Sequence, residues 1–129
     1  MLGAGIYPIT LAEMGSYSRD ADEYFENEEH ERLKEFLALH PESGDVLPGT
    51  KGVRKLRWPI KNYGYGRGAS VIYYFRDLNM PLYLLALYRQ GETIILNAAV
   101  KEELATLVDG LVAQHSKGWA RVIRQDKGA

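Results

Sequence analysis

Residues 52–58 read Gly-Val-Arg-Lys-Leu-Arg-Trp, and the rest of the chain is best understood outward from this stretch. Its composition predicts a β-strand, although three of its seven residues are cations. Because side chains alternate along a strand, Leu56 and Trp58 share one face, and Lys55 and Arg57 share the other. We expect Leu56 and Trp58 to face the core, which leaves Lys55 and Arg57 on an open face.

The positive charge extends beyond this strand. Residues 46–75 contain six Lys or Arg and no Asp or Glu, whereas residues 1–45 contain eleven acids and three bases. The net charge of the whole chain is only -1, so the protein is bipolar. Strand cations can simply discourage edge pairing, but cations interleaved with aromatic residues favour a polyanion, above all single-stranded RNA. The six bases are Lys51, Arg54, Lys55, Arg57, Lys61 and Arg67.

Two more strands are predicted after this one. A loop rich in glycine and tyrosine, residues 62–68, leads into the strand 69–76. Residues 77–81 form the connection to a third strand, 82–88, which is apolar throughout and predicts a central strand buried on both faces. A short first strand is also expected over residues 6–11.

Three helices complete the prediction. Residues 12–26 indicate a first helix, and residues 28–40 an amphipathic second helix with Asn27 as its N-cap. Pro41 ends this second helix. The third helix is expected over residues 100–113, where leucines and valines recur on one face.

These elements predict a single α+β domain over residues 1–115. It consists of a small antiparallel sheet with a mixed edge, an N-terminal helical hairpin and a C-terminal covering helix. Residues 116–129 form a polar tail in which Trp119, Val122 and Ile123 stand out as apolar. We expect this tail either to be flexible or to dock on a partner.

Composition narrows the classes of protein further. The chain has no cysteine, which excludes disulfides and thiolate chemistry and fits the cytoplasm. We expect neither a signal peptide nor a membrane span, because no apolar run approaches about 18 residues.

Three motifs then occur in an order that resembles the RelE/HigB family of toxins from bacterial type II toxin–antitoxin systems. Residues 44–57 read Gly-Asp-Val-Leu-Pro-Gly-Thr-Lys-Gly-Val-Arg-Lys-Leu-Arg. Residues 70–74 read Ser-Val-Ile-Tyr-Tyr, and residues 82–85 read Leu-Tyr-Leu-Leu. Together with the glycine-rich loop, the resemblance covers roughly residues 24–113.

The resemblance implies a RelE-like fold and a ribosome-dependent mRNA endoribonuclease that acts without metal or cofactor. It also implies three partners: the ribosome, its mRNA, and an antitoxin protein, which we expect to be of the helix-turn-helix type. No membrane partner is expected.

The chemistry of RNA cleavage assigns roles to particular residues. The 2′-OH must lose a proton, the phosphorane must be stabilised by cations, and the 5′-oxygen must gain a proton. Arg cannot be the base, so Lys and Tyr are the candidates for proton transfer. The expected catalytic residues are Arg57, Lys55, Arg67 and Tyr88. The expected RNA-binding residues are Arg54, Lys61, Tyr63, Tyr65 and Arg89, with the two tyrosines as a stacking platform.

The sequence departs from the family pattern at two expected cations. Ser70 stands where the family's strand opens with Arg, and Gln90 stands where the family has Lys. Arg67 and Arg89 are close enough in sequence to compensate. These departures leave two alternatives open: a RelE-like protein without nuclease activity that binds RNA, ribosome or antitoxin only, and an inhibitor of DNA gyrase like the related ParE toxins.

Overall fold

A computed structural model describes residues 9–59, 68–89 and 91–128, with the backbone alone over 117–128. Its five-stranded sheet has the order β1-β5-β4-β3-β2. The strands are β1 (Leu11–Glu13), β2 (Asp45–Val46), β3 (Val53–Pro59), β4 (Gly68–Tyr74) and β5 (Leu82–Arg89). All neighbouring strands are antiparallel except β1 and β5, which are parallel, so the predicted α+β sheet with one mixed edge is confirmed.

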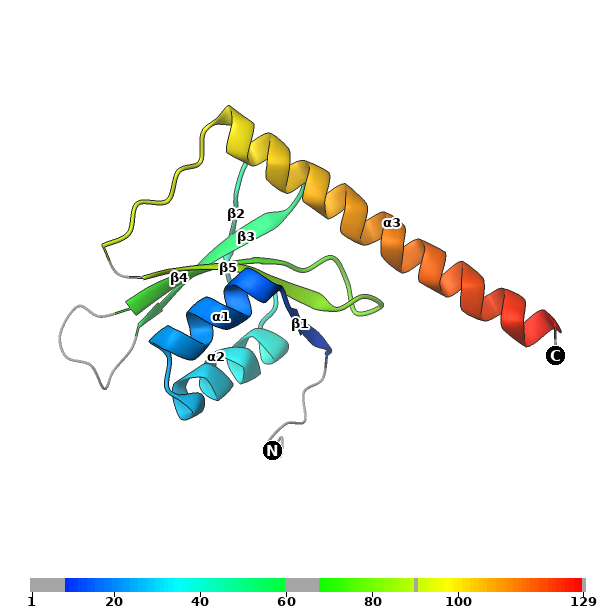
Figure 1. Ribbon diagram of the computed structural model, residues 1–129, viewed down its shortest axis with the longest axis horizontal. Helices are drawn as coiled ribbons and strands as arrows, with labels where there is room; N and C mark the ends of the chain where they lie inside the picture. The colour runs from blue at the N-terminus through cyan, green and yellow to red at the C-terminus, as the bar shows by residue number, and fades with distance from the viewer. Residues whose placement is uncertain (1–8, 60–67, 90, 129) are drawn as a thin grey trace.

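The helices lie on both sides of this sheet (Figure 1). They are α1 (Gly15–Tyr24), α2 (Asn27–Leu39) and α3 (Ala98–Gly128). The pair α1 and α2 covers one face as the expected helical hairpin, and α3 crosses the other face and extends past the end of the sheet (Figure 1). No described helix is long and apolar enough to cross a membrane.

Several boundaries differ from those that the sequence predicts. The first strand covers residues 11–13 rather than 6–11, of which residues 6–8 lie outside the described part. The N-cap of α2 is Glu26 rather than Asn27, and its side chain makes no capping bond. The third helix continues to Gly128 through most of the predicted tail.

The most buried strand is also not the one expected. All seven residues of β4 are buried, whereas only four of the eight residues of β5 are buried. The reason is topological, because β4 lies in the middle of the five strands and has helices on both faces. The apolar run of β5 is consistent with an inner strand, because β5 lies between β1 and β4. The central strand of the sheet is nevertheless β4.

The core consists of two clusters, one on each face of the sheet. Under the hairpin, Val71 and Tyr73 of β4 pack with Leu33 and Leu37 of α2. Under α3, the alternate residues of β4 pack with the apolar face of that helix. That second cluster includes Val53, Ile72, Tyr74, Leu85, Val108 and Leu111.

Tyr73 fixes the turn between α2 and β2. Its buried hydroxyl donates to the carbonyl of Pro41 at 2.9 Å and accepts from the backbone N–H of Gly44 at 2.8 Å. A Cβ atom at Gly44 would lie 2.8 Å from the Tyr73 ring and 3.0 Å from the carbonyl of Lys55. Gly44 is therefore required by close approach rather than by an unusual backbone angle.

His30 lies within the hairpin in a partly buried polar cluster. Its Nε2 atom is 3.1 Å from the hydroxyl of Tyr17 and 4.0 Å from the carboxylate of Glu13. Burial lowers the pKa of His30 below its ordinary 6.5, and the charge of Lys34 lowers it further. Three carboxylates act in the opposite direction without reversing the shift, namely Glu13, Glu31 and Asp22.

His30 should therefore make stability depend on pH. The unfolded chain binds more protons than the folded one, so this contribution is complete above a pH of 6.5 and decreases as the pH falls toward the lower folded pKa. We expect the free energy of unfolding of His30→Gln to fall less steeply than that of the wild type as the pH decreases below 6.5, as measured by urea titration. His40→Gln, at an exposed histidine, is the control variant. Equal slopes of unfolding free energy against pH for His30→Gln and wild type would contradict this role of His30.

Candidate nucleic-acid interface

Strand register places three of the polar residues in one row across the sheet. Arg57 of β3 pairs with Ser70 of β4, which in turn pairs with Tyr88 of β5. Since neighbouring strands are about 4.8 Å apart, the row spans roughly 10 Å of backbone. Lys55 lies one step along the same face, opposite Ile72. The structure thus brings together Lys55, Arg57 and Tyr88, which the sequence analysis chose separately.

This row lies on the face of the sheet away from the helical hairpin. Leu56 and Trp58 pack against the core beneath α1 and α2, which confirms their predicted inward orientation. Arg57 is exposed, Lys55 and Tyr88 are half-buried, and Ser70 is 9% exposed. Helix α3 packs on the cluster that contains Val53, at the other end of β3, and Tyr88 packs against the same cluster. We call the surface formed by Lys55, Arg57, Ser70 and Tyr88 the open face.

Ser70 occupies the centre of the open face. The sequence analysis treated it only as a departure from the family pattern, whereas register places it between Arg57 and Tyr88. An antiparallel β3–β4 pair that joins residues 53 and 74 also joins 57 and 70, but no signal in the sequence gave that register. A small neutral hydroxyl therefore stands where the resemblance implies a guanidinium.

Two of the six central bases are engaged away from the open face. Arg54 donates from Nη1 to the carbonyls of Glu42 and Gly44, at 3.0 and 2.7 Å, and so supports the turn after α2. Lys51 donates to Asp109 of α3 at 2.7 Å. These contacts give both residues a structural role that their charge alone did not indicate.

Arg89 lies on the opposite face from Tyr88. It shares a cross-strand row with Ala69 and Trp58, on the side of the helical hairpin. Its guanidinium is 3.1 Å from the carboxylate of Glu23 and lies over the ring of Tyr24, 5.5 Å from its centroid. The structure therefore does not bring Arg89 to the open face.

The remaining expected site residues, Lys61, Tyr63, Tyr65 and Arg67, lie outside the described residues. Both strands that flank their segment are held by the hairpin. Trp58 donates from Nε1 to Oε1 of Glu29 at 2.7 Å, and the hydroxyl of Tyr24 donates to the carbonyl of Gly68 at 2.8 Å. The sequence analysis missed this role of Glu29, although the residue lies one helical turn before Leu33 and so shares its buried face.

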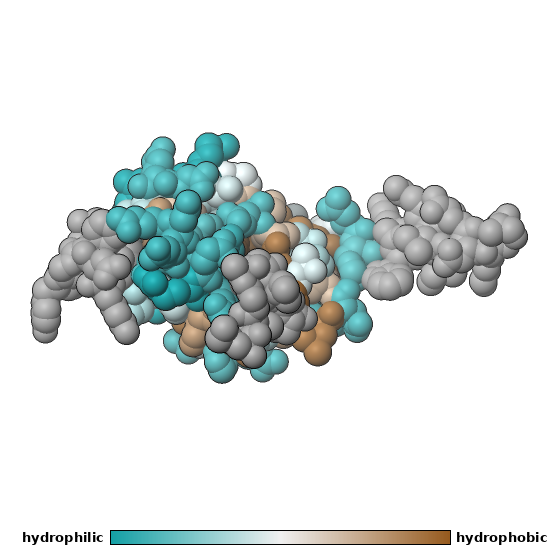
Figure 2. All heavy atoms as spheres, turned by 90° about the horizontal axis from the view of Figure 1, so that it is seen from below, coloured by the Kyte–Doolittle hydropathy of each residue, from teal (hydrophilic) through white to brown (hydrophobic). Residues whose placement is uncertain are grey.

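The acids of the hairpin lie on the other side of the molecule. Figure 2 shows hydrophilic side chains gathered over the face that carries α1 and α2. The exposed acids of this face are Asp22, Glu23, Glu26, Glu28, Glu31 and Glu35. These acids lie across the sheet from Lys55 and Arg57, whereas the exposed acids of α3, among them Glu102 and Asp109, lie on the same side as the open face. The separation of charge seen in the sequence is therefore retained in the structure for the hairpin and the central strand.

The open face combines a guanidinium, an ammonium and a phenol, which suit binding of a phosphate and proton transfer to or from its oxygens. Within residues 9–59, 68–89 and 91–128, no cluster of His, Asp or Glu could hold a metal ion. No protein-family model matches this chain.

Proposed function

We propose that this protein is a ribosome-dependent mRNA endoribonuclease, the toxin of a toxin–antitoxin module of the RelE/HigB type. The observation that carries the proposal is the row formed by Arg57, Ser70 and Tyr88, with Lys55 beside it on the open face. It is supported by the acidic hairpin on the opposite face. The cytoplasm is the expected compartment, and an antitoxin of the helix-turn-helix type the expected protein partner.

The proposed reaction forms one bond to phosphorus and breaks another. The 2′-oxygen attacks the adjacent phosphate and gives up its proton to Lys55 or Tyr88 as base. Arg57 stabilises the negative charge that develops on the phosphorane oxygens, where a preorganised cation is most effective. The P–O5′ bond then breaks and the 5′-oxygen takes a proton from the other of these two residues, which leaves a 2′,3′-cyclic phosphate and a 5′-hydroxyl.

A second candidate is the RelE-like protein that binds RNA, ribosome or antitoxin without cutting. The observation in its favour is the neutral, buried Ser70 at the centre of the row. With a serine there, the phosphate meets one fewer cation, which weakens transition-state stabilisation more than binding. A gyrase inhibitor has no comparable feature in its favour.

The direct test is to incubate the protein with purified ribosomes on a defined mRNA and to identify the new 5′ ends. The proposal expects cuts at positions set by the ribosome, with 5′-hydroxyl products. Absence of cuts, combined with retained ribosome binding, would favour the second candidate. Absence of both cuts and binding would contradict the proposal that the open face binds RNA on the ribosome.

Binding of RNA should also depend steeply on salt. Each phosphate that a cation neutralises releases counterions, so log K should fall against log salt with a slope of about -0.7 per phosphate contacted on a single strand. We expect Lys55→Ala to make this slope shallower by about one contact. Fluorescence anisotropy with a short labelled RNA measures it, and a flat response for wild type would rule out phosphate recognition.

A further inference from the structure

The end of strand β3 that carries Arg57 has less strand pairing than the middle of β3. Strand β2 is only two residues long, and its pairs with β3 involve only Arg54 and Lys55. The pairing with β4, in contrast, continues through Arg57 and Trp58 to Pro59. In the described part of the chain, strand pairing therefore constrains the end of β3 from the β4 side, and side chains provide further anchors.

Trp58 anchors this end of the strand to the helical hairpin. Its indole Nε1 donates to Oε1 of Glu29 at 2.7 Å, and the centroid of its ring is 5.4 Å from that of Phe36. Both partners belong to α2. Leu56, two residues earlier in β3, packs against the same core cluster as Trp58. The two residues that flank Arg57 in the sequence are thus both held by contacts on the hairpin side of the sheet.

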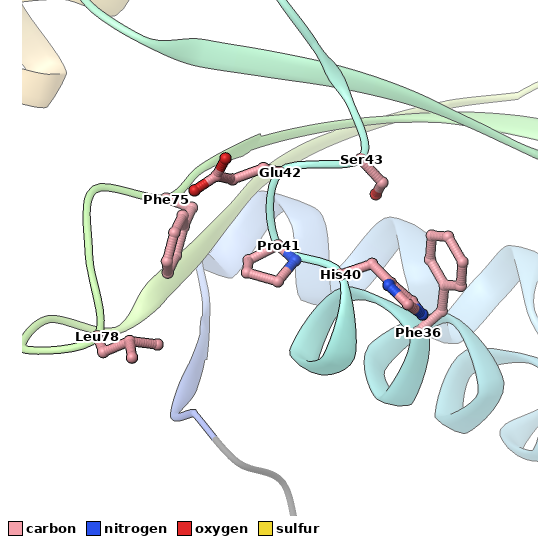
Figure 3. A pocket seen from close by; sticks show the side chains of 7 residues that line it. All are labelled: Phe36, His40, Pro41, Glu42, Ser43, Phe75 and Leu78. Carbon is pink, nitrogen blue, oxygen red and sulfur yellow. The ribbon is translucent and has the colours of Figure 1, made fainter.

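Of the two contacts that Trp58 makes with α2, the packing on Phe36 is the less constrained. Phe36 is half-buried and forms one wall of a groove of about 570 Å³ at the end of α2, where it lies beside His40 (Figure 3). A side chain that borders open space is less restricted than one enclosed in a close-packed core. The ring of Phe36 therefore does not fix Trp58 by itself.

Glu29 is the more rigid partner of Trp58. It lies in the first turn of α2, one turn before the fully buried Leu33, and its side chain is only 7% exposed. Its second carboxylate oxygen, Oε2, accepts from the guanidinium of Arg32 on the same helix. A buried carboxylate that accepts a bond on each oxygen has little freedom to move, and hydrogen bonds to an ionised acceptor are stronger than those between neutral groups.

The position of Trp58 is transmitted directly to Arg57. The two residues are adjacent in β3 and point to opposite faces of the sheet, so a rotation of the strand end that withdraws Trp58 also turns Arg57. A displacement of about 1 Å in a catalytic group can cost about 10²-fold in rate. The bond between Glu29 and Trp58 is therefore close enough to the open face to affect its chemistry.

We propose that Glu29 is a positioning residue for Arg57. It holds Trp58 from the hairpin side and thereby fixes the direction in which the guanidinium of Arg57 points on the open face. This inference rests on the proposed function, in which Arg57 stabilises the phosphorane. Glu29 acts through Trp58 and does not itself contact the RNA.

Single-turnover cutting of ribosome-bound mRNA tests the inference in a double-mutant cycle. Trp58→Phe keeps an aromatic ring beside Phe36 and removes the N–H donor, and it should slow cutting about tenfold while ribosome binding changes by less than about twofold. In the Arg57→Ala background the same substitution should slow cutting by less than about twofold, because Trp58 acts through Arg57. Equal effects of Trp58→Phe in the two backgrounds would overturn the inference.

Two variants of Glu29 separate the hydrogen bond from the charge. Glu29→Gln retains a carbonyl oxygen that can accept from Trp58, so it should cut within about threefold of the wild-type rate, whereas Glu29→Ala should be about tenfold slower. Equal rates for these two variants would contradict a role of the bond to Trp58.

Tyr73→Phe is the matched control for a general loss of stability. It removes the buried hydroxyl that bonds Pro41 and Gly44, and Tyr73 pairs with Arg54 nearer the other end of β3. It should cut at the wild-type rate. If Tyr73→Phe is slowed as much as Trp58→Phe, the effect of Trp58 is structural and the inference is wrong.

A measurement that does not require cutting distinguishes failure of this inference from failure of the proposed function. The order parameter of the Arg57 backbone amide, from ¹⁵N relaxation, should be about 0.85 in the wild type and fall toward about 0.6 in Trp58→Phe and Glu29→Ala. If the wild type does not cut but these variants loosen Arg57, the proposed function fails and the positioning by Glu29 stands. An amide that is equally rigid in all three proteins would show that Glu29 does not position Arg57, whether or not the wild type cuts.

Discussion

Arg57→Ala is expected to slow cleavage of ribosome-bound mRNA by about 10²–10³-fold, the usual cost of losing one preorganised donor to a transition state. Arg57 lies on strand β3, and strand register fixes its two neighbours in the row, Ser70 and Tyr88. Rigid placement matters because a mobile cation loses conformational freedom during the reaction. Single-turnover cutting rates with saturating ribosomes isolate this effect from binding.

Two further variants distinguish the role of Arg57 from a general loss of charge. Arg57→Lys should recover only part of the rate, because an ammonium cannot bond two phosphate oxygens with the planar fork of a guanidinium. Arg76→Ala removes another exposed guanidinium, which lies beside Asp77, and it should cut at the wild-type rate. If wild type and Arg57→Ala cut equally fast, the enzyme is retained but the proposed site is wrong.

Tyr73→Ala is expected to have the largest effect on stability, about 3–5 kcal/mol, which is the range for deleting a buried aromatic side chain. Tyr73 is fully buried, and its hydroxyl connects two parts of the turn between α2 and β2. The variant leaves a cavity beneath the hairpin and removes both bonds. Urea unfolding monitored by circular dichroism gives the change in free energy.

Tyr73→Phe separates the two contributions. It keeps the ring and leaves the N–H of Gly44 and the carbonyl of Pro41 without their partner, which should cost about 1–3 kcal/mol. Leu39→Ala is the control, because this side chain is 50% exposed and should change stability by less than about 0.5 kcal/mol. Equal stability of Tyr73→Phe and wild type would show that the hydroxyl does not hold the turn.

The strands and helices were predictable where a local signal was strong. The alternation of Leu56 and Trp58 against Lys55 and Arg57 fixed the orientation of β3, because only one of its faces can be apolar. The end of α2 was set by Pro41, which cannot continue a helix. Boundaries with weaker signals were placed less well, as the N-cap at Glu26 rather than Asn27 illustrates.

The candidate site was predicted in part. Lys55, Arg57 and Tyr88 do share one face, whereas Arg89 lies on the other, although it follows Tyr88 directly in the sequence. Adjacent residues of a strand point to opposite faces, so proximity along the chain did not bring them together. Nor did charge reveal that Arg54 supports a turn, since its carbonyl partners have no signature in the sequence.

The sequence by itself determined the three longest strands, the three helices in outline, the polarity of each face of β3 and the separation of acidic from basic charge, because these depend on residues close together in the chain. It did not indicate β2 or the continuation of α3 to Gly128. Only the tertiary structure decided which strand is central, where Ser70 lies between Arg57 and Tyr88, and that Glu29 and Tyr24 hold the flanks of residues 60–67. These features arise from contacts between residues distant in sequence. Strand order, register and packing fix such contacts, and no local pattern encodes them.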